Sequence, residues 1–463
     1  MLEEMILNSE ACFKGILDYV QEERNEQSID EVEKELFSKL LELGQDLMKV
    51  FVANQDRGYA GETITVVQDE DRESVELDYY SVSYRDIDYL SIFGAIEINR
   101  SYYYKKGHGG ICPLDGQLNL PDRKYSYLLQ RWLSAYCVKD TYDEAVKGLQ
   151  ELLGVSIPKL SMQMVMQDVS QKSDAFWEQQ PCPEGDAQIM VISADGKGVP
   201  MKQSWDRESP KRLKKGQKRT KKKEAVAGII YTVSRERQSS GSNQVRVVNK
   251  EVYASLLGKE HVYNHLKKRA NLRGLSDKNL LDEALFMADG DPALWTQKKS
   301  HFPGMTENLD FYHVSEYLWE IAHMFLAEGT KEAAGWVEKK EAQLKAGKAG
   351  YMIGGLKQML TKGKRTRDQG KQDRLKQIIG YFERNRYRMQ YDKCLALGYP
   401  IGTGAVEGTC KNLVKERMEG TGMRWTVAGA EAVLKLRSVY QSHYWSDFWN
   451  YYTMSQKPAK RVA

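Results

Sequence analysis

The sequence lacks the features that mark secreted, zinc-finger and membrane proteins. Its 463 residues include six cysteines, and no two of them form a C-x-x-C pair. This spacing argues against a dense disulfide framework and against a cysteine-based zinc finger. The chain opens with Met-Leu-Glu-Glu rather than a basic and then apolar leader, and no apolar run approaches ~18 residues. We therefore expect reduced thiols, a cytoplasmic location and no membrane partner.

Net charge is also small, at +4, but the charge is unevenly distributed. Between Lys211 and Lys223 nine of thirteen residues are Lys or Arg, and residues 357–393 hold twelve basic against four acidic residues. Such runs can be solvated loops, yet like charges are tolerated more easily where a polyanion neutralises them. Both runs are predicted to contact nucleic-acid phosphates. In the first run the phosphate-binding residues are Lys211, Arg212, Lys214, Lys215, Lys218, Arg219, Lys221, Lys222 and Lys223.

Two short apolar runs end in Asp-Gly, at residues 188–197 and 285–290. Each reads as a buried strand with an acid at its exit, Asp195 in the first and Asp289 in the second. A buried carboxylate costs several kcal/mol unless a cation neutralises it, and a divalent metal is the usual solution. Asp291 precedes Pro292 as a helix N-cap would, so Asp289 is the better candidate ligand.

The elements around these runs predict an α/β core with a helical interruption. Strands at 225–233 and 245–253 and a helical stretch separate the two acids, and a strand at about 309–314 then feeds a helix from Ser315. Residues 328–398 are mostly helical and basic. A helix that Thr403 can cap follows, and its spacing points Glu407 towards the sheet.

The N-terminal third of the chain changes its periodicity twice. Residues 1 to about 55 predict helix, with packing or self-association as its role, and residues 60–120 predict a small β-module. At the end of this module, His108 and Cys112 are too few to hold zinc. The sequence predicts a helix that Thr141 caps and Gly154 ends, followed by a second helix over about 161–173. This pair has the layout of a DNA-binding motif, although any αα-hairpin has the same layout. Residues that could face a groove are Lys159, Gln163 and Gln167.

Several of these motifs together resemble bacterial insertion-sequence transposases of the ISKra type. The resemblance covers roughly 90–450 and is carried by Ala194–Pro200, Ala288–Gly290, Asp310–Val314 and a long C-terminal block over 402–425. It implies a ribonuclease-H-like catalytic domain, a helical insertion before the last acid, and cutting and joining of DNA that depends on two Mg²⁺ (or Mn²⁺) ions. Matched residue by residue, the catalytic and metal-binding triad is Asp195, Asp289 and Glu407.

The resemblance implies further roles for residues around the triad. Asp310 and His313 match an acid-x-x-His motif that supports the active site, and we also expect Arg417 and Arg424 in the C-terminal block to contact DNA. Related chains often carry a Cys-paired zinc ribbon, whereas this chain keeps only His108 and Cys112, so zinc is not expected.

The sequence therefore predicts a nucleoid-associated DDE transposase that forms a homo-oligomer on DNA. A ribonuclease-H-like nuclease acting on RNA or branched DNA, and a DNA-binding regulator without catalysis, are the alternatives. The predicted parts are a helical segment at 1–58, a β-module at 59–121, a helical DNA-binding-like region at 122–182, a catalytic domain at 183–327 and 399–445, a basic helical insertion at 328–398 and a tail at 446–463.

Overall fold

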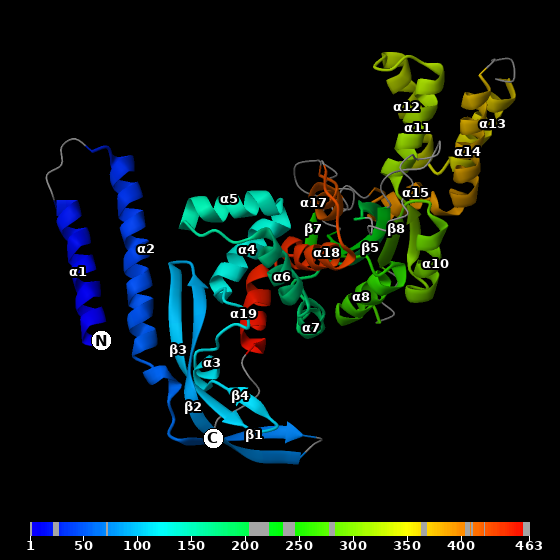
Figure 1. Cartoon of the computed structure of the whole chain (residues 1–463). Coiled ribbons are helices and arrows are strands. Elements are labelled where there is room, and N and C mark those ends of the chain that lie inside the picture. Colours follow the sequence, from blue (N-terminus) through cyan, green and yellow to red (C-terminus); the bar gives the residue numbers. More distant parts are fainter. Residues whose placement is uncertain are drawn as a thin grey trace, which may run out of the picture. The chain divides into compact units, whose positions relative to one another are not determined.

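The computed structural model describes residues 2–21, 27–70, 73–202, 222–234, 246–276, 283–362, 368–402, 408, 411–420 and 422–456. It divides into two compact units, one of Met1–Lys172 with Trp445–Ala463 and one of Ser173–Tyr444 (Figure 1). The first boundary falls within the helical region predicted at 122–182. The predicted tail contains helix α19 (Trp445–Ser455), which belongs to the first unit.

The first unit begins with helices α1 (Leu2–Gln21) and α2 (Ile29–Ala53), followed by the 3-10 turn η1 (Asp56–Gly58). An antiparallel sheet then runs in the order β1-β2-β3-β4. Its strands are β1 (Thr63–Glu70), β2 (Glu73–Ser91), β3 (Gly94–Lys105) and β4 (Gly109–Ile111). Ile96 and Ile98 of β3 pack with Met48 and Val52 of α2, so this helix covers one face of the sheet.

The rest of the first unit is helical. Its helices are α3 (Pro113–Gln117), α4 (Tyr127–Lys139), α5 (Tyr142–Leu153), α6 (Lys159–Ser170) and α19. Thr141 caps α5 by accepting a hydrogen bond from the Glu144 N–H at 3.1 Å, and Gly154 ends it with a left-handed φ of 64°. The predicted helix pair is therefore confirmed as α5 and α6, because its start and stop signals are local.

The second unit is built on a mixed sheet in the order β7-β6-β5-β8-β9. Its strands are β5 (Ile189–Pro200), β6 (Lys222–Val233), β7 (Val247–Ser255), β8 (Ala284–Ala288) and β9 (Thr306–Leu309). The pairs β5–β6 and β6–β7 are antiparallel, whereas β5–β8 and β8–β9 are parallel. The predicted sequence of three strands, a helix and a strand is confirmed.

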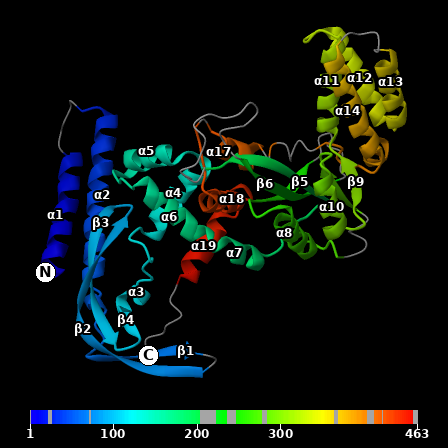
Figure 2. The same cartoon turned by 45° about the vertical axis from the view of Figure 1, so that its right-hand side comes forward.

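Helices cover this sheet and close its β7 edge (Figure 2). Helix α8 (Lys259–Leu272) packs on β6, and a Cβ on Gly228 would lie 2.6 Å from the Leu266 side chain. Helix α7 (Ser173–Gln179) and helix α18 (Val427–Gln441) also belong to this unit. The hydroxyls of Ser442 and Ser438 accept hydrogen bonds from the β7 N–H groups of Val252 and Ala254 at 2.9 and 3.0 Å. These bonds satisfy edge groups that would otherwise invite pairing with another chain.

The segment after β9 is a helical bundle. Helices α11 (Phe311–Phe325), α12 (Lys331–Lys345), α13 (Ala349–Lys362) and α14 (Gln369–Asn385) pack side by side (Figure 2). Residues 328–398 are mostly helical, as predicted, and α11 adds a helix that precedes this range. The turn η3 (Arg386–Arg388) and helix α15 (Tyr391–Ala396) return the chain to the sheet. Lys411–Lys415 and Glu416–Met418 are helical, whereas Thr403 and Glu407 lie outside the described residues.

The prediction of a strand over 309–314 with a helix from Ser315 is wrong. Strand β9 ends at Leu309 and helix α11 begins at Phe311. The cause is Asp310, whose carboxylate accepts a hydrogen bond from the Tyr312 N–H at 3.0 Å and so acts as the N-cap.

Among the described helices, none combines the length and apolar character needed to cross a membrane. None of the five described cysteines forms a disulfide; they are Cys12, Cys112, Cys137, Cys182 and Cys394.

Candidate active site

Two of the predicted catalytic acids occupy matching positions at adjacent parallel strands, Asp195 within β5 and Asp289 directly after β8. The β5–β8 pairing runs from Met190 opposite Ala284 to Ser193 opposite Met287. Two residues further along, the same register sets Asp195 beside Asp289. Neighbouring strands are ~4.8 Å apart, and an offset of two residues keeps a side chain on the same face. The two acids are 94 positions apart in sequence, and strand pairing brings them together.

A third aspartate continues the row onto β9. Ala288 pairs with Leu309, and the Asp310 N–H donates to the Ala288 carbonyl at 3.0 Å. The next register position sets Asp310 beside Asp289. We call Asp195, Asp289 and Asp310 the aspartate row, because they share one level across the sheet, with Asp195 in β5 and the other two directly after β8 and β9.

Asp195 does not lie at the end of its strand, contrary to the prediction. Strand β5 continues to Pro200 because its antiparallel pairing with β6 continues, with Asp195 opposite Ala227. Only the parallel pairing with β8 stops early, at Ser193. Asp195 is thus paired with β6 on one side. On the other side it lies beyond the last residue pair between β5 and β8.

The electrostatics of Asp289 show that the two carboxylates interact. Burial raises the pKa of Asp289, and the charge of Asp195 raises it further. A hydrogen bond from the Asp291 N–H, at 2.9 Å, and the nearby His313 act in the opposite direction on this pKa. Because desolvation and a like charge both oppose ionisation, a cation between Asp195 and Asp289 would relieve both costs.

Helix α10 (Pro292–His301) fixes the backbone that carries Asp289. Asp291 is its N-cap and accepts from the Ala293 N–H at 3.0 Å, as the sequence predicted. The Trp295 indole N–H donates to the Asp289 carbonyl at 2.6 Å. The helix start therefore orients Asp289 while Asp291 performs the capping.

Asp310 and His313 both belong to the start of α11. Asp310 is 2% exposed and caps the helix, so its carboxylate has a structural task. His313 is about one-third exposed and lies 3.4 Å from Glu316, measured from Nδ1 to Oε2. Its effect on the pKa of Asp289 agrees with the predicted position near the end of the Asp289 strand.

Sequence reasoning missed Tyr381, which reaches the aspartate row from helix α14 of the insertion. Burial and the charge of Asp289 raise the pKa of the Tyr381 hydroxyl, and the Gly290 backbone forms a hydrogen bond with it. A Cβ on Gly290 would collide with the Tyr381 ring. The glycine of the Ala288–Gly290 motif was the available signal, because only glycine admits this ring so close to the backbone.

Glu407 lies outside the described residues, but both segments next to it are anchored at this sheet. The Ile401 carbonyl accepts hydrogen bonds from the Phe311 N–H at 3.0 Å and from Asn308 Nδ2 at 3.1 Å. On the other side, Lys411–Lys415 packs against β5 and β6.

Among the residues that the structure describes, no group of three or more His, Cys, Asp or Glu side chains could hold a metal ion. The predicted third ligand, Glu407, is not among those residues. The observed donor set is the oxygen pair of Asp195 and Asp289, and Mg²⁺ and Mn²⁺ prefer carboxylate oxygens.

The predicted DNA-binding residues of the 211–223 run fall into two groups, those outside the described residues and those at the start of β6. Lys211, Arg212, Lys214, Lys215, Lys218, Arg219 and Lys221 lie outside the described residues. Lys222 and Lys223 are exposed at the start of β6, opposite Pro200 and Val199, and Lys222 Nζ lies 2.6 Å from Glu419 Oε1. Pro200 is five residues beyond Asp195, or about 17 Å along the strand. The two described lysines of the basic run therefore pair with the far end of β5, the strand that carries Asp195.

The two arginines predicted to contact DNA in the C-terminal block, Arg417 and Arg424, differ in their exposure. Arg424 is exposed, as a DNA contact requires. Arg417 is 1% exposed and lies over the Trp425 ring, 4.8 Å from its centroid. The prediction that Arg417 contacts DNA is corrected by this burial, because its guanidinium is enclosed by protein.

Part of the basic charge of the insertion is also neutralised within the chain. Arg374 forms a bidentate pair with Glu320 at 2.6 and 2.8 Å, and Lys357 pairs with Glu383. The buried Arg388 bonds Glu307 at 2.8 Å. The excess of basic residues in 357–393 therefore overstates the charge that remains for phosphates.

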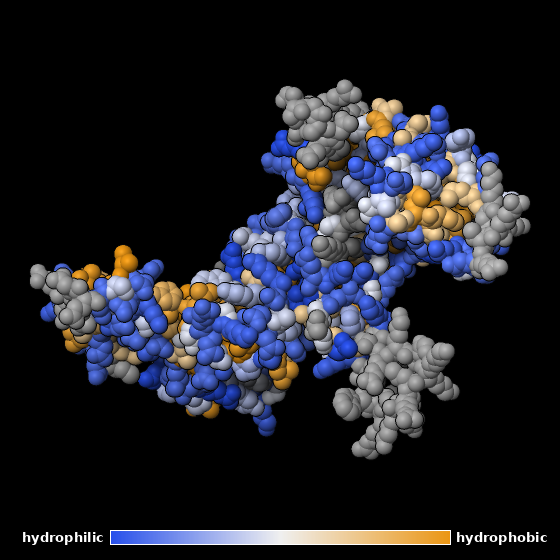
Figure 3. Space-filling model, turned by 90° about the horizontal axis from the view of Figure 1, so that it is seen from above, coloured by the Kyte–Doolittle hydropathy of each residue, from blue (hydrophilic) through white to orange (hydrophobic). Residues whose placement is uncertain are grey.

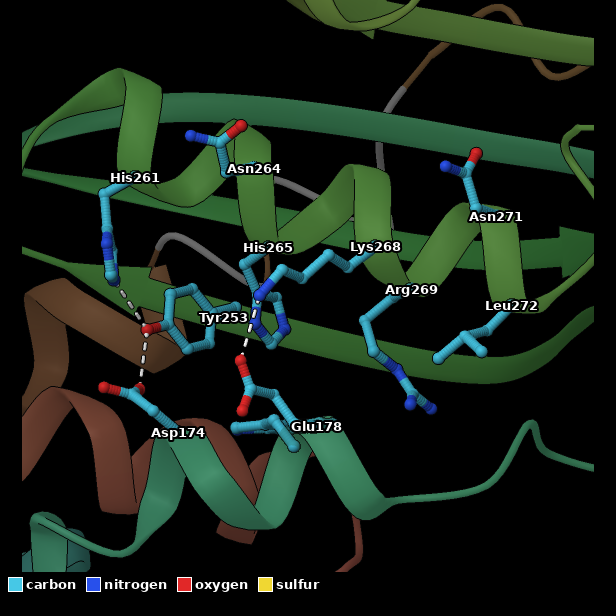
Figure 4. A pocket seen from close by; sticks show the side chains of 11 residues that line it. Asp174, Glu178, Tyr253, His261, Asn264, His265, Lys268, Arg269, Asn271 and Leu272 are labelled. Carbon is cyan, nitrogen blue, oxygen red and sulfur yellow. Dashed lines mark hydrogen bonds and ion pairs between the residues drawn. The ribbon is translucent and has the colours of Figure 1, made fainter.

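A second candidate site is a cavity of about 760 Å³ between α7, β7 and α8 (Figure 4). The Tyr253 hydroxyl lies 3.3 Å from Asp174 Oδ1 and 3.0 Å from His261 Nε2. His265 stacks on the Tyr253 ring at 3.7 Å, and burial holds the pKa of His265 well below its usual value. These groups satisfy one another, so they bind α7 to α8. The raised pKa of Asp289 and its interaction with Asp195 are the stronger sign of chemistry.

Comparison of the chain with protein-family models and with curated proteins finds no match in either case. What is shown is a mixed α/β unit in which Asp195 of β5 interacts electrostatically with Asp289, the residue directly after the adjacent parallel strand β8.

Proposed function

We propose that this chain is a DDE transposase that cuts and joins the DNA of an insertion sequence. Its ribonuclease-H-like catalytic domain is the second unit, and Asp195, Asp289 and Glu407 bind two Mg²⁺ ions. The observation that carries the proposal is the shared register of Asp195 and Asp289 together with the raised pKa of Asp289. The sheet order, with three antiparallel strands followed by two parallel ones, supports the fold.

The residues of the site have distinct tasks in this proposal. Asp195 and Asp289 supply carboxylate oxygens from adjacent strands, and Glu407 adds a third from a segment anchored at Ile401 and at Lys411–Lys415. Mg²⁺ ions held by these carboxylates would supply the activation of a water or 3′-hydroxyl and the stabilisation of the leaving oxygen. The chain therefore needs no protein nucleophile.

DNA contacts would come from cations on the same unit. Lys222 and Lys223 are exposed at the end of the β5–β6 ladder, in which β5 carries Asp195. Arg424, five residues after Glu419 in the sequence, is also exposed. Phosphate contacts of this kind position the backbone and carry no sequence information. Recognition of the element ends is assigned to α5 and α6 of the first unit, where Gln163 of α6 is exposed.

The proposal is tested by Mg²⁺-dependent nicking of DNA that carries the element's terminal repeats, with an RNA–DNA hybrid as the competing substrate. Asp195→Asn, Asp289→Asn and Glu407→Gln should each reduce cleavage by more than the ~10–100-fold typical of an outer partner, because each removes a direct ligand. Binding of the same DNA should remain. The matched control is Asp291→Asn, since asparagine also caps helices.

The outcomes separate the alternatives. Preferential cutting of the hybrid would identify a ribonuclease-H-like nuclease instead. DNA binding without any cleavage, unchanged in all three variants, would identify a regulator without catalysis.

A further inference from the structure

The N-terminal hairpin of α1 and α2 presents an apolar face that neither helix covers. The two helices contact each other and run antiparallel (Figures 1 and 2). Helix α2 has 25 residues and none of them is buried. A helix in a globular protein usually owes its stability to burying an apolar face. The contacts of α2 with α1 and with β3 leave part of its apolar surface exposed.

The contact between the helices uses one stripe on each. On α1 the least exposed residues recur at spacings of three and four, and they include Met5, Cys12, Ile16 and Tyr19. On α2 the corresponding partly buried stripe includes Leu36, Lys39, Asp46 and Val50. The Lys39 ammonium lies 5.4 Å from the centroid of the Tyr19 ring, across the two stripes. This spacing is that of a coiled-coil seam.

A second, exposed apolar stripe follows the first on both helices. Each of its residues comes directly after a residue of the contact stripe. The exposed residues are Ile6, Phe13, Leu17 and Val20 on α1, and Phe37, Leu40, Leu47 and Phe51 on α2. We call these residues the outer stripe.

The outer stripe forms one face of the hairpin rather than two. One residue is a rotation of about 100° around a helix, so both halves of the stripe are turned from the contact seam by the same angle and in the same sense. Because the helices are antiparallel, equal rotations bring both halves to the same side. Apolar side chains are visible in Figure 3 at the end where α1 and α2 lie in Figure 1.

The area of this face is large enough for a stable interface. The residues of the outer stripe are between 40% and 55% exposed. Taking ~200 Å² for each phenylalanine when fully exposed and less for the smaller aliphatic residues, they present roughly 600–800 Å² together. The largest apolar patch on an ordinary monomer is ~300–600 Å², whereas each partner in a standard interface contributes about 800 Å².

We infer that the outer stripe binds the same face of a second copy of this chain, so that two hairpins form a four-helix bundle. An antiparallel pair of helices with one continuous apolar face is half of such a bundle. A twofold axis satisfies both faces at once with no other protein, because the interface is self-complementary. The inference rests on the hairpin alone and does not depend on the proposed catalysis.

The test is the mass of the full-length protein without DNA, measured by sedimentation velocity over a range of concentrations. The wild-type chain should be a dimer. The double variant Leu40→Glu with Leu47→Glu should raise the dimer Kd by about 100-fold or more, because two buried anchors are replaced by charges. Both residues are about half exposed in the single chain, so its helix content by circular dichroism should not change.

Leu7→Glu is the matched control, because Leu7 is a 63% exposed leucine of α1 outside the outer stripe. This variant should remain a dimer. A wild-type chain that stays monomeric at ~100 μM, or a dimer that survives the double variant, overturns the inference. Phe13→Glu on α1 provides an independent second variant if the double variant loses helix content.

Discussion

At the scale of single residues, Asp289 is the group whose chemistry depends most on its surroundings. Its backbone is held by Trp295 and its carboxylate accepts from the Asp291 N–H, yet burial and Asp195 oppose its charge. Its folded pKa therefore lies above the unfolded value. Stability from this group is fully present below the unfolded pKa and is lost as the pH rises through the folded pKa. At neutral pH the ionised carboxylate costs stability unless a cation is bound.

We accordingly expect Asp289→Asn to raise the Tm of the metal-free protein at pH 7 to 8. The gain should shrink on acidification, because the wild-type carboxyl then becomes neutral as well. Mg²⁺ should raise the Tm of the wild type and have little effect on the variant. For a domain of this size each kcal/mol corresponds to ~2–4 °C, which calorimetry resolves.

Asp291→Asn is the control for this measurement, because it changes a neighbouring carboxylate that caps α10. It should show no gain that fades on acidification. A lower Tm for Asp289→Asn at neutral pH would mean that the charge of Asp289 is already compensated within the chain.

At the scale of elements, the start of α11 joins the insertion to the aspartate row. Asp310 caps the helix and His313 in its first turn lowers the pKa of Asp289. We expect His313→Ala to reduce cleavage by ~10–100-fold, the usual cost of losing an outer partner of a metal ligand. The fold should persist, because His313 is about one-third exposed and the Asp310 cap remains.

His323→Ala is the matched control on the same helix. It lies ten residues further along α11, or about 15 Å away, and its ring contacts Trp319 at 5.5 Å. The assay is the rate of nicking at saturating Mg²⁺ for both variants. Equal rates in wild type and His313→Ala would show that His313 only packs at the start of the helix.

At the scale of the whole molecule, we propose that the second unit binds the DNA backbone and that the first unit recognises the ends of the element. Replacing Lys214, Lys215, Lys218, Lys221 and Lys222 by Ala should weaken binding to terminal-repeat and random DNA about equally. Each lost phosphate contact on duplex DNA should reduce the slope of log K against log salt by about 0.9. The catalytic sheet should remain intact, since Lys222 is exposed at the strand end.

The measurement is a salt titration of binding for the wild type and this loop variant on both DNAs. Gln163→Ala on α6 is the comparison, because it should reduce the preference for terminal repeats and leave the slope unchanged. An unaltered slope in the loop variant would show that the segment is a solvated tether. A loss confined to terminal repeats would place recognition in the second unit.

The sequence by itself determined the elements whose signals are local. Thr141, Gly154 and the Asp291–Pro292 pair mark helix ends through hydrogen bonds and backbone angles that need only a few neighbouring residues. The apolar runs before Asp195 and Asp289 predicted buried strands for the same reason. The start of α11 was misplaced because an apolar run at a helix start is indistinguishable from a strand by periodicity alone.

Only the tertiary structure decided which of these residues meet. The register that sets Asp195 beside Asp289 is a property of pairing between β5 and β8, which no local pattern encodes. Tyr381, ninety-one positions after Gly290 in the sequence, contacts it from helix α14, and Arg417 is buried against the Trp425 ring. Arg374, Lys357 and Arg388 form ion pairs with Glu320, Glu383 and Glu307, so composition alone overstates the positive charge left for phosphates. Local chemistry fixes the elements, whereas burial and charge pairing depend on contacts that only the folded chain creates.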